Sequence, residues 1–297
     1  MKGRITMEKM QKKQGVFVVV LGIYALCFSF RIWEYFILRT DQTVLGEAVV
    51  HKLLGIAILF IVAKMLHLTL KEIGFSKERS LHNVLKGLAF GVGTFIIAYV
   101  AEIIILMVQG KFDSLQIYVS AYAVDKNVGY QTAFVFFIIC ILGNIINVIM
   151  EDGVFRGLFI RILEERYSFI ISAVLSSVLF AFWHGIGPIR NYYDGISSMG
   201  GMIANVIMLV VTSGLVGFKF ALLTKMTGSA YMAMGDHFVN NMIVNLLHVV
   251  SHTGADELMI VRLSIAQSIS CIIVLLYYWK EKLKYRNKCA KYTASLK

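Results

Sequence analysis

Three clusters of ionisable and amide side chains lie within or beside long apolar runs of this sequence. They are Glu151 to Arg156, Phe180 to His184, and His237 to Asn241. An ionisable side chain inside a bilayer costs on the order of 2.5–3.5 kcal/mol on insertion scales, so such groups are retained mainly where they have a function. We therefore take these three clusters as the candidate chemistry of the chain.

The first cluster places two carboxylates side by side, directly after an apolar run. Asp152 and Arg156 are four residues apart, so on a helix they can pair on one face. Glu151 lies about 100° away from Asp152 around the helix axis. Gly153 and Gly157 have the spacing of small residues that lets a second helix approach closely. The alternative interpretation is a helix that acquires charges as it leaves the membrane.

The second and third clusters contain histidines inside apolar stretches. His184 follows Phe180 by four residues near the end of a predicted helix. The third cluster begins a polar stripe on one helical face, made of His237, Asn241, Asn245 and His248. A polar stripe facing lipid would leave its groups unsatisfied, so it must face a cavity or other helices. The alternatives are an interfacial histidine and interhelical hydrogen bonds, a common use of Asn and His in bundles.

Chain geometry brings the first two clusters together. The predicted turn between their helices lies near Tyr167 and Ser168, with Glu151 sixteen residues before Tyr167 and His184 sixteen residues after Ser168. At about 1.5 Å per residue, each side chain lies about 24 Å from the turn if both helices are unbroken. An antiparallel hairpin therefore predicts that Glu151 and His184 lie at the same depth.

These residue types favour hydrolysis by water. A carboxylate and an imidazole can together deprotonate and orient a water molecule. A second imidazole and an amide can donate hydrogen bonds to a developing oxyanion. The clusters offer no serine or cysteine beside a base as a nucleophile. On this interpretation Asn240, off the face of His237, and Asn245, one turn beyond Asn241, are expected to tolerate alanine.

Composition indicates that lipid is the solvent for much of the surface. The chain is 58% hydrophobic and 16% charged, against about 45–50% and about 25% in soluble domains. The single proline fits long uninterrupted helices. The net charge of +11 is concentrated near both ends of the chain. Basic flanks beside apolar spans follow the positive-inside rule, so the charge indicates a membrane partner and not nucleic acid.

Eight apolar runs are long enough to cross a bilayer, which takes about 20 residues. The runs are 15–38, 46–66, 84–108, 131–150, 168–187, 199–223, 229–250 and 258–279. The sequence thus predicts an all-α polytopic membrane protein, a bundle of about eight transmembrane helices whose fourth, fifth and seventh members enclose a polar intramembrane cavity. The even count places both basic ends on the cytoplasmic side.

The chain is predicted to have three parts in sequence order. Residues 1–130 form an N-terminal three-helix portion that ends in the longest polar break, 109–130. Residues 131–250 hold the three clusters and form the catalytic core. Residues 251–297 supply the final transmembrane helix and a basic cytoplasmic tail.

The three motifs resemble those of a known family of membrane proteases. Their order and spacing are similar to those of the CAAX protease and bacteriocin-processing (CPBP) family, which resembles type II CAAX prenyl endopeptidases, over residues 131–250. The resemblance implies that Glu151 and His184 activate the hydrolytic water and that His237 and Asn241 hold the oxyanion. It gives Arg156 a structural role, and Asp152 stands where the family has a second glutamate. Phe180 belongs to the motif of His184.

The resemblance implies an intramembrane endopeptidase that acts on a membrane-associated or lipophilic peptide, which we expect in a bacterial plasma membrane. Two histidines and a glutamate could bind zinc. The chain lacks a His-Glu-x-x-His motif and Asn is a poor ligand, so a metal-free mechanism without a cofactor is favoured. A zinc-dependent variant and an immunity protein that binds a bacteriocin without proteolysis remain the alternatives. A proton-coupled transporter is disfavoured, because the chain shows no repeated halves.

Overall fold

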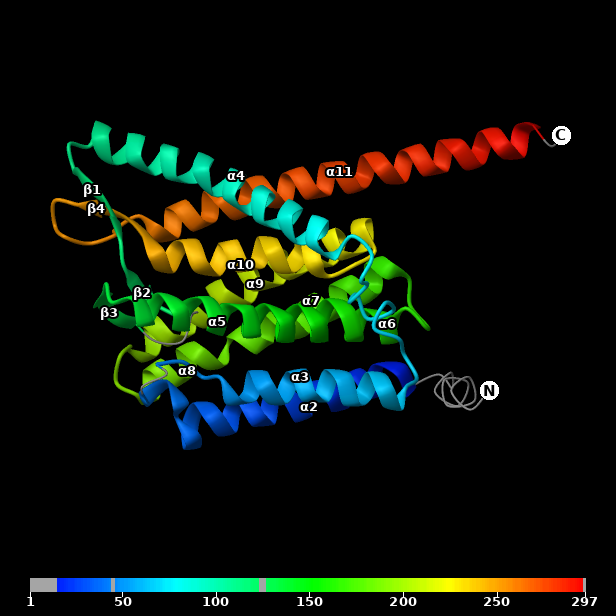
Figure 1. Ribbon diagram of the computed structural model, residues 1–297, viewed down its shortest axis with the longest axis horizontal. Coiled ribbons are helices and arrows are strands. Elements are labelled where there is room, and N and C mark those ends of the chain that lie inside the picture. The colour runs from blue at the N-terminus through cyan, green and yellow to red at the C-terminus, as the bar shows by residue number, and fades with distance from the viewer. Residues whose placement is uncertain (1–14, 44–45, 123–126, 296–297) are drawn as a thin grey trace.

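A computed structural model describes residues 15–43, 46–122 and 127–295, so most of the basic N-terminal segment lies outside the described residues. Long helices that run roughly alongside one another form the molecule (Figure 1). They are α2 (Gly15–Trp33), α3 (Val50–Met65), α4 (Ser80–Val108), α5 (Phe134–Glu151), α7 (Phe169–His184), α9 (Met199–Thr227), α10 (Tyr231–Leu246) and α11 (Met259–Ser295). This is the all-α polytopic architecture of about eight helices that the sequence predicts.

Six helical segments in the described part of the chain are long and apolar enough to cross a membrane. They are Gly15–Gln42, Ser80–Val108, Phe134–Leu163, Phe169–Tyr193, Met199–Thr227 and Met259–Lys284. The other two long helices, α3 and α10, have 16 residues each. Helix α10 buries Asp236, His237 and Asn241. It is therefore a polar helix of the bundle interior, and its neighbours shield it from lipid.

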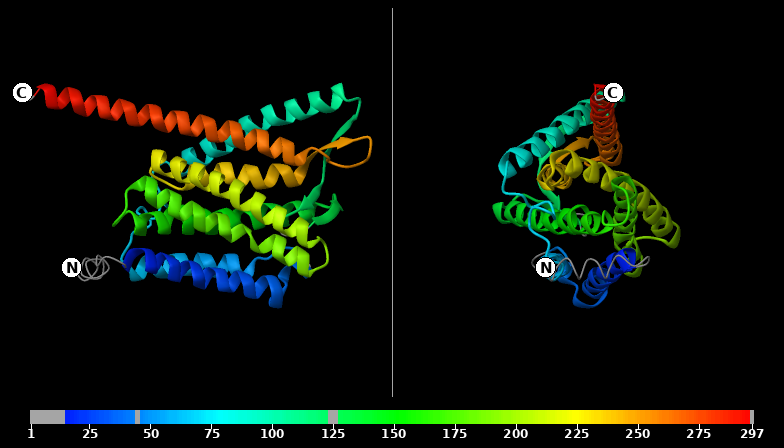
Figure 2. Two further views of the ribbon diagram at one scale, coloured as in Figure 1. Left: turned by 180° about the vertical axis from the view of Figure 1, so that it is seen from behind. Right: turned by 90° about the vertical axis from the view of Figure 1, so that its right-hand side faces the viewer.

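The helices form layers on either side of a central group. Helices α2 and α3 lie on one side, α4 and α11 lie on the opposite side, and α5, α7, α9 and α10 lie between them (Figures 1 and 2). Helix α4 packs against α10 and α11. The first three helices of the chain therefore contribute to both sides of the central group. Helices α2 and α11 begin at opposite ends of the bundle. The start of α2 and the end of α11 are therefore on the same end of the molecule, on opposite sides of the bundle (Figure 1).

Glycines permit the close contact between α4 and α10. A Cβ atom on Gly235 would lie 2.6 Å from the carbonyl oxygen of Val84, and one on Gly87 would overlap the backbone of Met232. Larger side chains at these positions would push the two helices apart. The contact holds the polar face of α10 in a fixed position relative to α4.

The fourth long helix of the chain changes its pitch directly after Glu151. Helix α5 continues as the π-helix η3 (Asp152–Phe159) and the short helix α6 (Ile160–Leu163), and every residue of η3 is buried. The prediction that Glu151 and His184 lie at the same depth assumed an unbroken α-helix after Glu151, and this assumption is incorrect. A π-helix has i→i+5 hydrogen bonds and is frequent at functional sites.

The two glycines of η3 permit close approach, as their spacing predicts. A Cβ atom on Gly153 would lie 2.6 Å from Leu59 of α3, and one on Gly157 would overlap the carbonyl oxygen of Ile73 in the segment that follows α3. The neighbours are therefore α3 and this segment. They hold η3 against the N-terminal side of the bundle.

Four short strands depart from the all-helical expectation. Strand β1 (Phe112–Ile117) pairs antiparallel with β4 (Leu247–Ser251), and β2 (Val119–Ala121) pairs with β3 (Asn127–Gln131). They lie at the end of the bundle opposite the start of α2 (Figure 1). The polar break 109–130 thus contains strands, and the predicted helix to residue 250 ends at Leu246. Strand pairing satisfies the backbone groups of both segments.

The strand β4 removes His248 from the polar stripe of α10. His248 Nδ1 lies 3.1 Å from Asp256 Oδ2, and its ring stacks on Tyr118 with 3.9 Å between centroids. Asp256 also accepts a 2.6 Å hydrogen bond from Arg262, which donates a 2.5 Å bond to Glu102 of α4. This buried ion cluster fixes the start of α11 against α4.

Candidate active site

Glu151, the last residue of α5, lies at the centre of the candidate site and is 3% exposed. Trp183 Nε1 donates a 3.1 Å hydrogen bond to Oε1, and Asn147 Nδ2 donates a 3.3 Å bond to Oε2. Arg31 Nη1 of α2 lies 3.9 Å from Oε1. Groups from α2, α5 and α7 therefore fix the orientation of this carboxylate.

His184 ends α7 and lies beside Glu151. Its Nδ1 lies 2.9 Å from the carbonyl oxygen of Phe180. A carbonyl can only accept, so Nδ1 carries the hydrogen and Nε2 of the neutral ring keeps its lone pair. Glu151 and His184 are close enough to interact electrostatically. The predicted equal depth of the two side chains is thus met although the intervening helix is not a regular α-helix. His184 is also more exposed than Glu151.

His237 of α10 is held between the two adjacent carboxylates. Its Nε2 lies 3.6 Å from Glu151 Oε2, and its Nδ1 lies 3.1 Å from Asp152 Oδ2. Arg156 Nε lies 3.4 Å from Asp152 Oδ1, the pairing that their spacing predicts. Glu151 and Asp152 approach opposite nitrogens of the ring, which agrees with their different directions on the helix.

Phe180 lies close to both histidines and to Arg156. Its ring centroid lies 4.5 Å from that of His184 and 6.4 Å from that of His237. The Arg156 guanidinium carbon lies 3.7 Å from the Phe180 centroid. Phe180 thus supports both imidazoles, and Arg156 supports Phe180 and Asp152.

Asn241 follows His237 by one turn on the buried face of α10 and is 6% exposed. Its Oδ1 accepts a 3.1 Å hydrogen bond from Asn240 Nδ2, and its backbone oxygen accepts a 2.7 Å bond from Asn245. The side-chain oxygen is therefore engaged on one side. The amide nitrogen Nδ2 is the group that Asn241 can offer to another molecule.

Arg31, Asn147 and Trp183 also belong to the site, although sequence spacing did not assign them to it. Arg31 lies over the Trp183 ring at 4.6 Å and over the Tyr35 ring at 4.8 Å. Signals in the sequence could have found Arg31 and Asn147. Arg31 is an ionisable residue within an apolar run, and Asn147 lies one helical turn before Glu151.

A second buried polar cluster adjoins the site from α2 and α3. His51 Nδ1 lies 2.6 Å from Glu34 Oε2, and Glu34 also accepts a hydrogen bond from Thr40. The His51 ring lies 5.8 Å from the Trp183 ring. Sequence patterns gave Glu34 and His51 no role, and the structure places both behind the tryptophan that contacts Glu151.

The arrangement of the donor groups bears on the zinc alternative. Across residues 15–43, 46–122 and 127–295, no group of three or more His, Cys, Asp or Glu side chains is arranged to hold a metal ion. The two nitrogens of His237 face different carboxylates. Glu151 and Asp152 therefore do not converge on one nitrogen of His237, whereas a zinc site requires at least three converging protein ligands.

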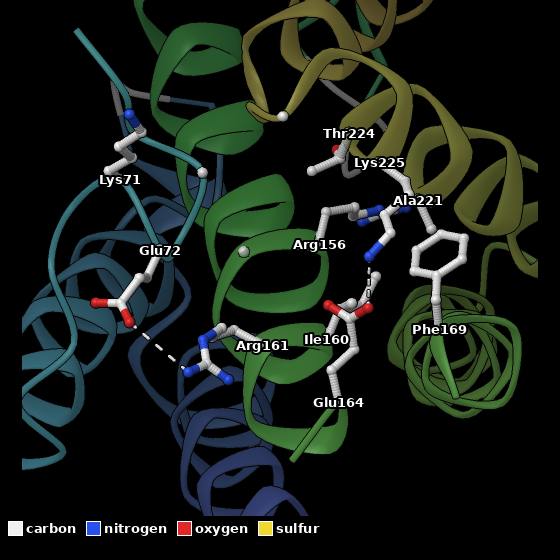
Figure 3. Close-up of a pocket in the computed structure, with 13 residues that line it drawn as sticks. Lys71, Glu72, Arg156, Ile160, Arg161, Glu164, Phe169, Ala221, Thr224 and Lys225 are labelled. Carbon is white, nitrogen blue, oxygen red and sulfur yellow. Dashed lines mark hydrogen bonds and ion pairs between the residues drawn. The ribbon is translucent and has the colours of Figure 1, made fainter. Parts of the chain in front are cut away.

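A pocket of about 270 Å³ lies beside the candidate site, beyond Arg156 (Figure 3). Its charged lining is largely paired, since Lys225 Nζ lies 2.7 Å from Glu164 and Arg161 lies 3.7 Å from Glu72. Arg156 is shared between this pocket and the contact with Asp152. The four candidate catalytic residues do not line the pocket.

The middle of the chain is similar to a family of membrane proteases. Residues 133–243 match the family model described as type II CAAX prenyl endopeptidase Rce1-like. The matched segment spans α5, η3, α7, α9 and most of α10, and so includes Glu151, His184, His237 and Asn241. No curated protein matches the chain.

Proposed function

We propose that this chain, which its Rce1-like domain assigns to the CAAX protease family, is an intramembrane endopeptidase. Its substrate would be a peptide bond in a membrane-associated or lipophilic peptide. The observation that carries the proposal is the convergence of Glu151, His184 and His237 from three helices within the matched domain. Buried titratable groups gathered in this way are typical of catalytic sites.

Glu151 and His184 have the chemistry to activate water. The hydrogen bonds from Trp183 and Asn147 orient the Glu151 carboxylate, and the lone pair on His184 Nε2 can accept a hydrogen bond from the same water. As the water oxygen attacks the carbonyl carbon, its proton passes to Glu151. When the C–N bond breaks, Glu151 returns this proton to the leaving amine. The residues act on water directly, without a covalent intermediate.

His237 and Asn241 are suited to stabilise the oxyanion of the tetrahedral intermediate. Asp152 accepts a hydrogen bond from Nδ1 of His237 and fixes the plane of the ring. In the imidazolium form Nε2 also carries a hydrogen, which it can donate to the oxyanion. Asn241 Nδ2 supplies the second donor. Donors fixed before the reaction stabilise the charge without the cost of reorganisation.

Cleavage of a quenched peptide library by purified protein tests the proposal. Wild type, Glu151→Gln and the control Glu164→Gln are compared in detergent micelles. Glu164 is a carboxylate that pairs with Lys225 outside the site. We expect cleavage by wild type and Glu164→Gln, none by Glu151→Gln, and similar thermal unfolding for all three. Equal activity in Glu151→Gln, or a well-folded wild type that cleaves no library member, would contradict the proposal.

A further inference from the structure

A buried ion pair joins α9 and α10 at the residue that precedes His237. Lys219 Nζ of α9 lies 2.7 Å from Asp236 Oδ2 of α10, and both residues are buried. An ion pair removed from water is costly unless further hydrogen bonds complete it. Lys219 has two such bonds, to Gln267 Oε1 at 2.9 Å and to Ser270 Oγ at 3.1 Å, both from α11.

A chain of side-chain amides leads from this ion pair to Asn241. Gln267 Nε2 donates a 2.6 Å hydrogen bond to Asn240 Oδ1, and Asn240 Nδ2 donates a 3.1 Å bond to Asn241 Oδ1. Each link therefore runs from a nitrogen to an oxygen in the same direction. This series of hydrogen bonds connects α9, α11 and α10. Gln267 lies outside the segment that matches the protease family.

The chemistry of lysine fixes the donor-to-acceptor direction of these hydrogen bonds. An ammonium group donates hydrogen bonds and cannot accept them. Gln267 must therefore turn its oxygen to Lys219, which leaves its nitrogen for Asn240. Asn240 must then accept from Gln267, and its own nitrogen faces Asn241. Reversing any one amide would set two donors or two acceptors against each other.

We propose that Lys219, Gln267 and Asn240 are positioning residues that fix the orientation of the Asn241 amide. Because Oδ1 of Asn241 is held by Asn240, Nδ2 faces the substrate carbonyl as an oxyanion donor. A reversed amide would present an oxygen there and repel the developing charge. The inference rests on the proposed function and adds residues from α9 and α11 to the protease site.

Two substitutions at Gln267 give opposite tests of orientation. In Gln267→Glu the side chain still pairs with Lys219, but it can only accept from Asn240. Asn240 then turns its nitrogen toward position 267, its oxygen faces Asn241, and the Asn241 amide reverses. In Gln267→Met the link is removed without a reversal. We expect Gln267→Glu to lower kcat on the order of 10²–10³-fold, as for loss of an oxyanion donor, with KM little changed and a smaller loss in Gln267→Met.

A double substitution separates positioning from packing. In an Asn241→Ala background, Gln267→Glu is expected to cause no further loss of kcat, because the group that it misorients is already absent. Asn83→Asp is the matched control. Asn83 is a buried amide that donates a 2.9 Å hydrogen bond to Ser229 away from the site, so the same amide-to-acid change should leave kcat near wild type.

The outcomes distinguish this inference from the proposed function. Near-normal kcat in Gln267→Glu, a larger loss in Gln267→Met, or additive losses with Asn241→Ala would overturn it while the protease assignment stands. A readout without turnover is the side-chain ¹⁵N–¹H signals of asparagine-labelled protein. Gln267→Glu should shift the signals of both Asn240 and Asn241, and unchanged signals would refute the proposed chain even in an inactive protein.

Discussion

At Glu151, side chains from three helices contact one carboxylate. Trp183 and Asn147 each donate to one of its oxygens, and Arg31 lies 3.9 Å from the oxygen that Trp183 binds. These neighbours fix the orientation of the carboxylate. In the proposed mechanism, the attacking water approaches Glu151 from the side of His184 and His237.

Trp183→Phe tests the contribution of one of these neighbours. Phenylalanine keeps an aromatic ring for Arg31 and Phe155 to pack against, but it cannot donate to Glu151. A hydrogen bond to a charged group contributes about 1.5–3 kcal/mol. We therefore expect kcat to fall roughly tenfold to a hundredfold, with little change in thermal unfolding. Trp33→Phe, at the exposed end of α2, is the control, and equal kcat in both variants would rule out the contact as a determinant of activity.

Sequence spacing predicted the candidate site better than it predicted the residues behind the site. Periodicity placed His237 and Asn241 on one face because that relation is local. It also put Asn240 off this face and predicted that alanine would be tolerated there. The structure gives Asn240 a hydrogen bond to Asn241 and another to Gln267. A contact with a residue 27 positions away follows from helix packing, which spacing within one helix does not reveal.

At the scale of elements, η3 and the strands mark the limits of pattern arguments. The paired charges and glycines of η3 follow from i,i+4 spacing, which is nearly the same in both helix types. The wider turn of the π-helix, by contrast, leaves no recognisable pattern in the sequence. The strands replace a predicted loop and a predicted helix end because pairing between β1 and β4 joins segments more than 100 residues apart.

Gly157→Ala tests the packing of η3 against the segment that follows α3. The new Cβ atom would overlap the carbonyl oxygen of Ile73, which belongs to the backbone and cannot move aside alone. Overpacking typically costs about 1–3 kcal/mol, so we expect lower thermal stability. Gly143→Ala on α5 is the control, because a Cβ atom there meets no atom within 4 Å. Comparable unfolding temperatures for the two variants would be inconsistent with this packing.

At the scale of the whole molecule, the sequence predicted the count of long helices and the proximity of the fourth, fifth and seventh, but not most of the other contacts between helices. Apolar runs of about 20 residues identify membrane spans because the bilayer has a fixed thickness. Which helices touch depends on contacts between distant segments, such as α4 with α10. The sequence therefore did not indicate that α2 supplies Arg31 to the site, or that Gln267 of α11 hydrogen-bonds to Asn240 behind it.

Cysteine labelling in intact cells tests the predicted orientation. Single cysteines at Lys111 and His252 near the strands should react with a membrane-impermeant reagent, whereas cysteines at Lys77 and Glu78 should not. All four positions are exposed, so access depends on the side of the membrane. The background lacks the four native cysteines. Permeabilised cells, in which all four positions should react, supply the control, and labelling of position 77 in intact cells would refute a cytoplasmic N-terminus.

The central claim, that Glu151 and His184 direct water onto a peptide bond, is tested most directly by oxygen transfer. A substrate peptide is cleaved in a single turnover in H₂¹⁸O. Mass spectrometry then gives the masses of the product and of the proteolytic fragment of the protein that contains Glu151. Direct attack by water predicts one ¹⁸O atom in the new carboxylate of the product and none in Glu151. Product that carries only ¹⁶O, with the label in Glu151, would show that the glutamate itself attacks and would contradict the account.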